Sequence, residues 1–235
     1  MGRAFEYRRA AKEKRWDKMS KIFPKLSRSI TLAAKDGGPD PEANSKLRTA
    51  INNAKAENMP KDNIDKAIAR ATSNEGANFA ESSYEGKGPH GVLFWVECAT
   101  DNPTRTVANV KTIFKKNEGE IVQSGSLEFL FSRKTAIEFP AEGLDLEEVE
   151  LALIDAGLEE FEEIDGTVFV YGDFKDFGNL SSACDALEIE GVKAAHKRIP
   201  TSPIEITEAQ MDEVEVILDK LEDDEDVQAV YTNIA

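Results

Sequence analysis

The spacing of apolar residues changes once along this chain, and that change limits the folds it can adopt. From Trp16 to Ala33 apolar residues recur at steps of three and four, the spacing of one face of an α-helix. Segments around Leu47 and Ile64 repeat this spacing, with short connections between them. After residue 90, short apolar runs and alternating patterns become frequent. The sequence therefore predicts a helical bundle followed by mixed α and β structure.

Proline and glycine divide the helical part. Pro24 lies within the first stripe, so a helix is expected either to kink there or to begin close before it. A Gly-Gly-Pro sequence ends this helix. Asp40 is expected to cap the next helix, with Pro41 at its first position. Residues 72–90, rich in Ser, Asn, Gly and Glu, are interpreted as a linker.

A strand–helix–strand pattern follows this linker. Residues 92–98 are expected to form a buried strand, and 127–131, whose apolar residues alternate, a second one. Asp101 or Asn102 is expected to cap the helix between them, because a proline follows at the first helical position. The expected inward positions of this helix are Val107, Val110, Ile113 and Phe114.

The remaining residues indicate one domain inserted into another. Segment 134–200 follows the ferredoxin-like order β-α-β-β-α-β, and Asp165–Gly166 supplies a two-residue hairpin turn. Thr207 and Gln210 then form a capping box that opens a helix, and a strand follows. We expect an α+β fold: an N-terminal helical bundle followed by two ferredoxin-like α/β domains, one inserted in the other. The expected boundaries are 1–75 for the helical bundle with a basic N-terminal arm, 76–133 plus 201–235 for the split α/β domain, and 134–200 for the inserted βαββαβ domain.

Charge is distributed very unevenly along the sequence. The chain has 29 Lys and Arg against 45 Asp and Glu, a formal net charge of −16, which taken alone argues against a simple cationic nucleic-acid binder. Residues 1–28, however, carry ten bases and three acids, whereas residues 76–235 carry 12 bases and 35 acids. Such asymmetry favours contact between the basic end and a polyanion. The candidate nucleic-acid-binding residues are Arg3, Arg8, Arg9, Lys12, Lys14, Arg15, Lys18, Lys21, Lys25 and Arg28.

Aromatic residues strengthen this interpretation. Phe5, Tyr7 and Trp16 lie among the bases, and an aromatic ring near an arginine can stack on an unpaired base. At helical spacing, several of the basic side chains can share one face. A cationic helix face that is simply solvated is the alternative.

Other classes of protein find little support. The longest apolar run, 92–96, is too short to span a bilayer, and no apolar stretch follows the basic start, so neither a membrane segment nor a signal peptide is expected. Two cysteines, Cys98 and Cys184, do not make a disulfide framework, which favours reduced thiols in the cytoplasm. A Cys98–His90 nucleophile pair is conceivable, but a buried strand cysteine and a loop histidine are the favoured interpretation.

We expect no enzyme, cofactor, metal site or small-molecule substrate. No metalloprotease, paired-cysteine or nucleophile-elbow motif occurs. The acidic run, which we define as residues 222–226, is more typical of a solvated helix end than of a divalent-metal site. At a helix C-terminus it opposes the helix dipole and is expected to cost a little stability.

Several motifs in fixed order resemble the YebC/PmpR family. The sequence matches its signatures nearly end to end, at KIFPKL (21–26), GGPDPEAN (37–44), NMPKDNI (58–64), YEGKGPHGV (84–92), TDNPTRT (100–106) and GSLEFLF (125–131). The sequence departs from the family at its start, where MGRAFEYRRA replaces a common GHSKW-containing segment. It also has Pro24, Pro39 and His90 where other residues are usual.

This resemblance implies a helical N-terminal domain and two α/β domains around a cleft, with no established catalysis or cofactor. Members are described as probable transcriptional regulators that bind DNA, and others, including mitochondrial relatives, as translational activators associated with the ribosome. We therefore expect a cytoplasmic transcriptional regulator that binds DNA through its basic helical domain. A ribosome-associated translational activator that binds ribosomal RNA is the alternative.

Overall fold

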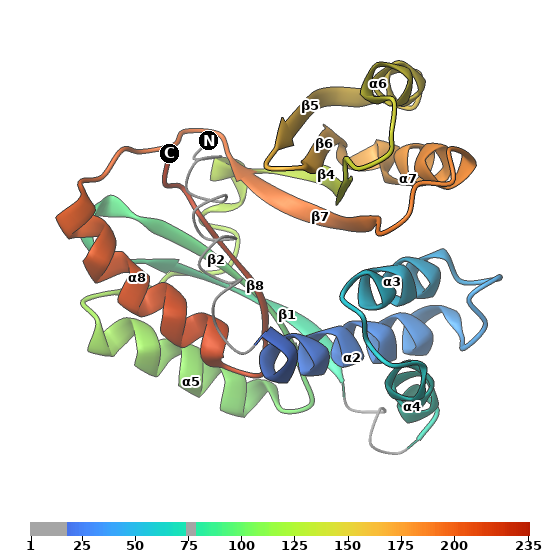
Figure 1. Cartoon of the computed structure of the whole chain (residues 1–235). Helices are drawn as coiled ribbons and strands as arrows, with labels where there is room; N and C mark the ends of the chain where they lie inside the picture. The colour runs from blue at the N-terminus through green and yellow to red at the C-terminus, as the bar shows by residue number, and fades with distance from the viewer. Residues whose placement is uncertain (1–17, 74–78) are drawn as a thin grey trace.

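Three main hydrophobic cores organise the structure, a computed structural model that describes residues 18–73 and 79–235 (Figure 1). One core lies among the N-terminal helices, which we call the helical unit. The other two each lie between a four-stranded sheet and a pair of helices. The predicted α+β class is confirmed, with N-terminal helices followed by two antiparallel sheets.

The helical unit consists of α2 (Lys18–Gly37), α3 (Ser45–Ala56) and α4 (Lys61–Ala71). Its helices bury the apolar stripes that the sequence predicts, because residues three and four apart fall on one helix face. Pro24 lies inside α2, and the helix continues on both sides of it. The residues that fill this core include Ile30, Leu47, Ile51, Ala54, Ile64 and Ala67.

The cap of α3 is Asn44, so the prediction that Asp40 caps this helix was wrong. The Asn44 side chain accepts a hydrogen bond from the Leu47 N–H (3.1 Å) and donates to the carbonyls of Ala33 (2.7 Å) and Gly38 (2.8 Å). Asp40 instead accepts from the Glu42 N–H in an exposed turn. A buried amide that can both donate and accept satisfies two helix ends at once, which a carboxylate cannot do.

Replacing Asn44 with alanine is expected to lower the free energy of unfolding by about 2 kcal/mol, because it removes a cap together with the hydrogen bonds to the Ala33 and Gly38 carbonyls. Urea unfolding followed by circular dichroism measures the change. Asp40→Ala is the matched control and should change stability by less than about 0.5 kcal/mol. Equal effects of the two variants would contradict this assignment of the cap.

The second unit, here the split unit, has strand order β3-β1-β2-β8. Its helices α5 and α8 pack on the sheet through one core, in which Phe94, Phe114 and Ile217 are fully buried. The elements are β1 (Ala80–Lys87), β2 (Leu93–Thr100), α5 (Pro103–Lys116), β3 (Glu120–Ile121), α8 (Glu208–Asp223) and β8 (Val227–Thr232).

Strand β1 lies within residues 72–90, so the interpretation of this segment as a linker was wrong. The strand pairs with both β2 and β3, so it is internal to the sheet. Its inward residue Gly86 faces the Phe114 ring, and a Cβ atom there would lie 2.5 Å from the ring. Because glycine takes the place of an apolar side chain, the alternation that marks a buried strand is missing.

Residues 127–131 do not form the expected strand. Glu128–Leu130 form a short 3₁₀ helix, η3, and Phe129 is 74% exposed, whereas Leu127 and Phe131 are buried beside Trp95. The buried Glu85 carboxylate explains the bend, since it accepts hydrogen bonds from the backbone N–H groups of Gly125 and Leu127. These bonds hold the chain in a turn before the next strand begins.

The third unit, here the inserted unit, has strand order β5-β6-β4-β7 and the predicted β-α-β-β-α-β sequence. The Asp165–Gly166 turn is confirmed, with positive φ at both residues (47° and 75°), as a type I′ hairpin requires. The elements are β4 (Phe131–Pro140), α6 (Leu146–Ile154), β5 (Leu158–Ile164), β6 (Thr167–Asp173), α7 (Phe177–Ala186) and β7 (Lys193–Pro200).

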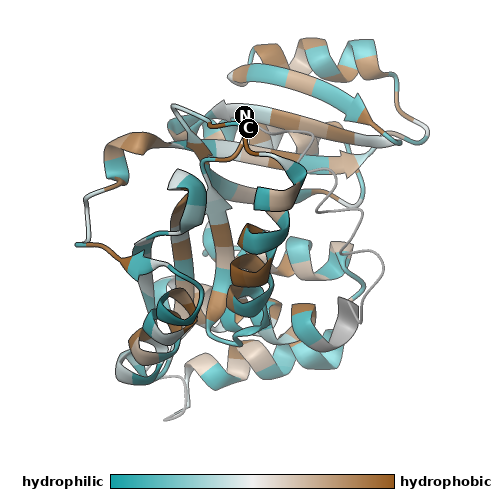
Figure 2. Cartoon of the chain, turned by 90° about the vertical axis from the view of Figure 1, so that its left-hand side faces the viewer, coloured by the Kyte–Doolittle hydropathy of each residue, from teal (hydrophilic) through white to brown (hydrophobic). Residues whose placement is uncertain are grey.

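The helices behave as ordinary amphipathic elements. The capping box at Thr207 and Gln210 is present and opens α8 as predicted. In Figure 2 hydrophilic and hydrophobic residues both occur along the helices, consistent with one buried and one solvent-facing side. Among the described residues, no helix has the length and apolar character needed to cross a bilayer.

The helical unit contacts both other units. Helix α2 passes beside the connection between α8 and β8, and α3 lies against β7 (Figure 1). At the second contact the Asn53 side chain donates to the Ala194 carbonyl (2.8 Å) and accepts from the Ala194 N–H (2.9 Å). Asn53 thus pairs with the free edge of β7 much as a neighbouring strand does.

Candidate nucleic-acid interface

The predicted basic residues divide into two groups. Arg3, Arg8, Arg9, Lys12, Lys14 and Arg15 lie outside the described residues, and Lys18 is the first described residue of α2. The other three, Lys21, Lys25 and Arg28, share one side of α2 because their spacing of four and three residues matches the helical repeat. We call these three residues the basic face of α2.

The basic face of α2 contacts the acidic run. Lys21 Nζ donates to Asp223 Oδ1 (2.5 Å), and Lys25 Nζ donates to the backbone carbonyl of Glu222 (3.0 Å). Arg28 Nη2 donates to Glu225 Oε2 (3.2 Å). The hydrogen bond with Asp223 raises the pKa of Lys21 above its ordinary value, although some desolvation opposes the shift. These residues are about 200 positions apart in the sequence.

The acidic run was expected to be a solvated helix end, and that expectation was wrong, because it contacts α2. Its last member, Asp226, is buried, with only 3% of its side chain exposed. Arg105 Nη2 lies 2.9 Å from both Asp226 carboxylate oxygens, and Thr106 Oγ1 donates to Oδ2 (2.8 Å). Arg28 Nη2 adds a longer ion pair at 3.6 Å. The negative charge of Asp226, at the buried end of the run, is thus paired with Arg105 and with Arg28.

These contacts set the protonation of Asp226. Burial acts to raise its pKa, but the hydrogen bonds from Arg105 and Thr106, with the positive charges of Arg105 and Arg28, outweigh burial and lower the pKa below its ordinary value. The same hydrogen bond raises the pKa of Arg105. Asp226 is accordingly ionised at neutral pH.

The TDNPTRT motif builds this network. Asn102 caps α5 by accepting from the Arg105 N–H (3.1 Å), as predicted, and Pro103 occupies the first helical position. The hydroxyls of Thr100 and Thr106 lie 2.8 Å apart and are both fully buried. Because a carboxylate only accepts, Thr106 donates to Asp226 and accepts from Thr100.

The residues of α5 that face the core differ from those expected from the sequence. Thr106 is buried, whereas Val107, an expected inward residue, is 37% exposed. The hydrogen bond from Thr106 to Asp226 holds the start of the helix with this residue inward. Val110 and Phe114 are buried as expected.

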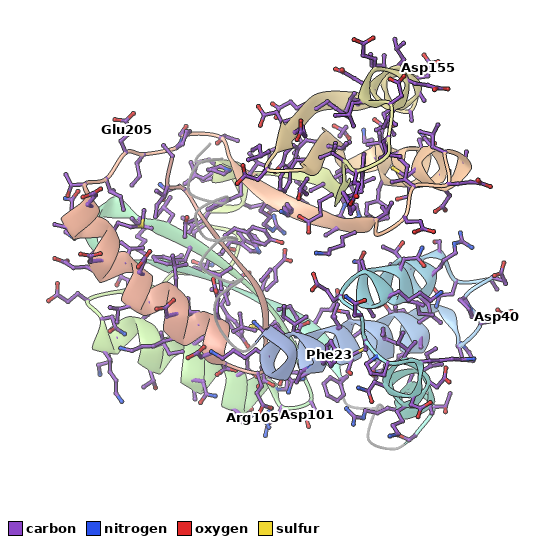
Figure 3. All side chains as sticks on the ribbon, in the orientation of Figure 1. Phe23, Asp40, Asp101, Arg105, Asp155 and Glu205 are labelled. Atoms are coloured by element: carbon purple, nitrogen blue, oxygen red, sulfur yellow. The ribbon has the colours of Figure 1, made fainter. Side chains whose placement is uncertain are left out.

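A polar pocket of about 520 Å³ opens between α2, the start of α5 and the acidic run. Figure 3 shows Asp101 and Arg105 beside the part of α2 that carries Phe23. Four carboxylates and two arginines line this pocket, and the arginines already pair with carboxylates of the same lining. The lining residues are Arg28, Asp101, Arg105, Asn109, Asp224, Glu225 and Asp226.

Cys98 and His90, the conceivable nucleophile pair, lie in different surroundings. Cys98 is buried in the split-unit core, and burial raises its pKa to about 12, so the thiol stays protonated at neutral pH. His90 contacts α8, with Nε2 2.8 Å from Glu213 and Nδ1 3.2 Å from Gln210. Cys184 is likewise buried and free. Within residues 18–73 and 79–235, no three His, Cys, Asp or Glu side chains are grouped to hold a metal.

Comparisons with known proteins match nearly the whole chain. Residues 3–74 match the model for the TACO1/YebC protein N-terminal domain, and residues 79–234 match the TACO1/YebC second and third domain. Proteins named probable transcriptional regulatory protein from Wolinella succinogenes (62% identical) and Sulfurimonas denitrificans (61%) each align over 100% of both chains.

The fold also matches a solved structure. A conserved hypothetical protein from Aquifex aeolicus superposes with a TM-score of 0.84 at 36% sequence identity. The match covers 93% of this chain and 91% of that one.

Proposed function

Because this chain belongs to the TACO1/YebC family, we propose that it regulates transcription by binding DNA through its basic N-terminal helical domain. The observation that carries this proposal is the separation of charge. Ten of the 29 bases fall within residues 1–28, whereas residues 76–235 are strongly acidic. Affinity for nucleic acid comes largely from Lys and Arg contacts with phosphates, and an acidic body repels phosphate elsewhere.

The contacts of α2 indicate which basic residues are available to contact phosphates. Lys21 and Arg28 already pair with carboxylates within the chain, and Lys25 donates to the backbone carbonyl of Glu222. Residues 1–18 hold seven further bases and three acids. We therefore assign the first phosphate contacts to these seven bases.

Neutralising three of these bases is expected to weaken DNA binding by roughly 30-fold at about 100 mM salt. The variant is Arg8→Gln, Arg9→Gln, Lys12→Gln, tested by fluorescence anisotropy with a labelled duplex. Since each lost phosphate contact removes one released counterion, the slope of log K against log salt should become less negative by about 2.7.

A matched control removes the same charge from α5. Lys111, Lys115 and Lys116 are exposed in the split unit, and their replacement by Gln should leave the salt slope unchanged. Equal losses in both variants would show that net charge alone matters and would overturn the assigned surface.

The acidity of the inserted unit favours a second candidate function. Residues 134–200 contain five bases and 17 acids, a composition suited to a basic protein partner. Ribosomal proteins are generally basic, so the alternative is a translational activator that binds ribosomal RNA through the same N-terminal bases.

Sedimentation of cell lysate separates the two candidates. Co-migration with ribosomes at moderate salt, without sequence-selective duplex binding, would reject the transcriptional proposal. A promoter footprint that survives excess competitor DNA would reject the ribosomal one.

A further inference from the structure

We propose that the acidic run occupies, within the same chain, phosphate-binding positions on the basic face of α2, and that bound nucleic acid displaces it. This inference rests on the proposed function and adds regulation to it. The acidic run then acts as a built-in competitor that lowers affinity for non-cognate polyanions.

The acidic run offers the basic face of α2 the same kind of acceptor that a phosphate does. Carboxylate oxygens of Asp223 and Glu225 accept from Lys21 and Arg28, in the way phosphate oxygens accept from these side chains in nucleic-acid complexes. The acidic run also leaves Arg28 incompletely paired, since its Nη1 atom is buried without a hydrogen-bond partner among the described residues. A phosphate group offers more acceptor oxygens than the single Glu225 contact and can satisfy this donor.

The contacts of Asp223 and Glu225 with α2 are exposed and therefore weak. The Lys21 and Asp223 side chains are 51% and 60% exposed, and Glu225 is 81% exposed. Exposed ion pairs contribute little to stability and are screened by salt. Asp226, by contrast, is anchored by Arg105 and Thr106 within the split unit. The run can therefore release α2 without unfolding its own base.

The helical unit has a hydrophobic core of its own. Its core shares no residue with the cores of the other two units, among the residues that the structure describes. Polar contacts join it to both units, through the α2 contacts above and the Asn53–Ala194 pair. Polar interfaces between domains allow relative motion more readily than apolar ones.

The proposal predicts that removing the outer carboxylates strengthens binding. In the full chain, Asp223→Asn with Glu225→Gln should bind a labelled DNA duplex about threefold to tenfold more tightly than wild type at about 100 mM salt. The matched control is Glu142→Gln with Glu150→Gln, which makes the same charge change on exposed residues of the inserted unit. The control should change affinity by less than about twofold.

Two different failures are distinguishable. If wild type binds the duplex but the acidic-run variant binds no more tightly than the control, displacement is wrong and the proposed function stands. If neither wild type nor variant binds DNA or ribosomal RNA at low salt, the proposed function fails and this inference fails with it.

Hydrogen exchange of the unmodified protein gives a test that needs no variant. The N–H groups of Asp226 and Val227 are bonded to Asp224, and that of Asp224 to the Leu221 carbonyl. Addition of duplex should accelerate exchange of this segment, while the β4–β6 ladder stays protected. Unchanged or slower exchange at 222–227, with duplex bound, would overturn the proposal.

Discussion

Replacing Asp226 with alanine is expected to lower the free energy of unfolding by about 3 kcal/mol, because it breaks a buried, hydrogen-bonded ion pair. The variant loses three hydrogen bonds from Arg105 and one from Thr106. Arg105 is 47% exposed and keeps Asp101 as a partner, so its own charge stays solvated. This places the loss at the lower end of the range for broken buried pairs.

Urea unfolding of wild type and three variants tests the assignment. Asp226→Asn keeps the shape and loses the charge, so its cost should be smaller, at about 2 kcal/mol. Asp101→Asn breaks only an exposed pair and should cost less than about 1 kcal/mol. If Asp101→Asn costs as much as Asp226→Ala, the network does not centre on Asp226.

The loss should also depend on pH in one direction. The pKa of Asp226 is lowered in the folded protein, so its contribution to stability is fully present above the unfolded pKa of about 3.9. It disappears as the pH falls through the still lower pKa of the folded state. Wild type and Asp226→Ala should therefore differ fully at neutral pH and converge in strong acid. A gap that widens on acidification would contradict the ionised network.

Phe114→Ala is expected to have the larger effect, with a loss of about 3–5 kcal/mol in the free energy of unfolding. The Phe114 ring is fully buried and meets Phe94 edge to face, with ring centroids 5.3 Å apart. Gly86 and Gly119 lie against the ring, and neither has a side chain that can fill the space left behind. The cavity therefore stays open, which adds to the lost burial.

Two controls accompany this variant in thermal and urea unfolding. Phe114→Leu keeps much of the volume and should lose only about 1–2 kcal/mol. Val107→Ala, two turns earlier on α5 at an exposed position, should lose less than about 0.5 kcal/mol. A cost at position 107 close to that at 114 would mean that Val107 is buried as Phe114 is, which contradicts the packing of α5 described above.

The same residues explain what the sequence could predict. Helical stripes in α2, α3 and α8 are complete in the sequence, so these helices and their buried faces could be predicted from spacing alone. Strand β1 could not, because its core position is a glycine that makes room for Phe114. The alternation at 127–131 was misleading, since the Glu85 carboxylate imposes a turn from 40 residues away.

The candidate site was only half visible in the sequence. Spacing could place Lys21, Lys25 and Arg28 on one helix face, and composition could mark the acidic run. Contact between the basic face of α2 and the acidic run could not be predicted, because it depends on the tertiary fold. A basic helix face has the same sequence pattern whether it binds phosphates or carboxylates. The role of the TDNPTRT motif was hidden for a related reason: its partner, Asp226, is 120 residues away.

The strand order β3-β1-β2-β8 has a consequence for synthesis. A ribosome completes α2 to α4 first and then the contiguous inserted unit, while β8 emerges only afterwards. Domains of a nascent chain generally fold in the order in which they emerge. The split unit therefore stays one strand short until late in translation, and α2 spends that whole interval without its acidic cover. Each newly made chain therefore passes through a form in which the basic face of α2 is exposed before the acidic run covers it.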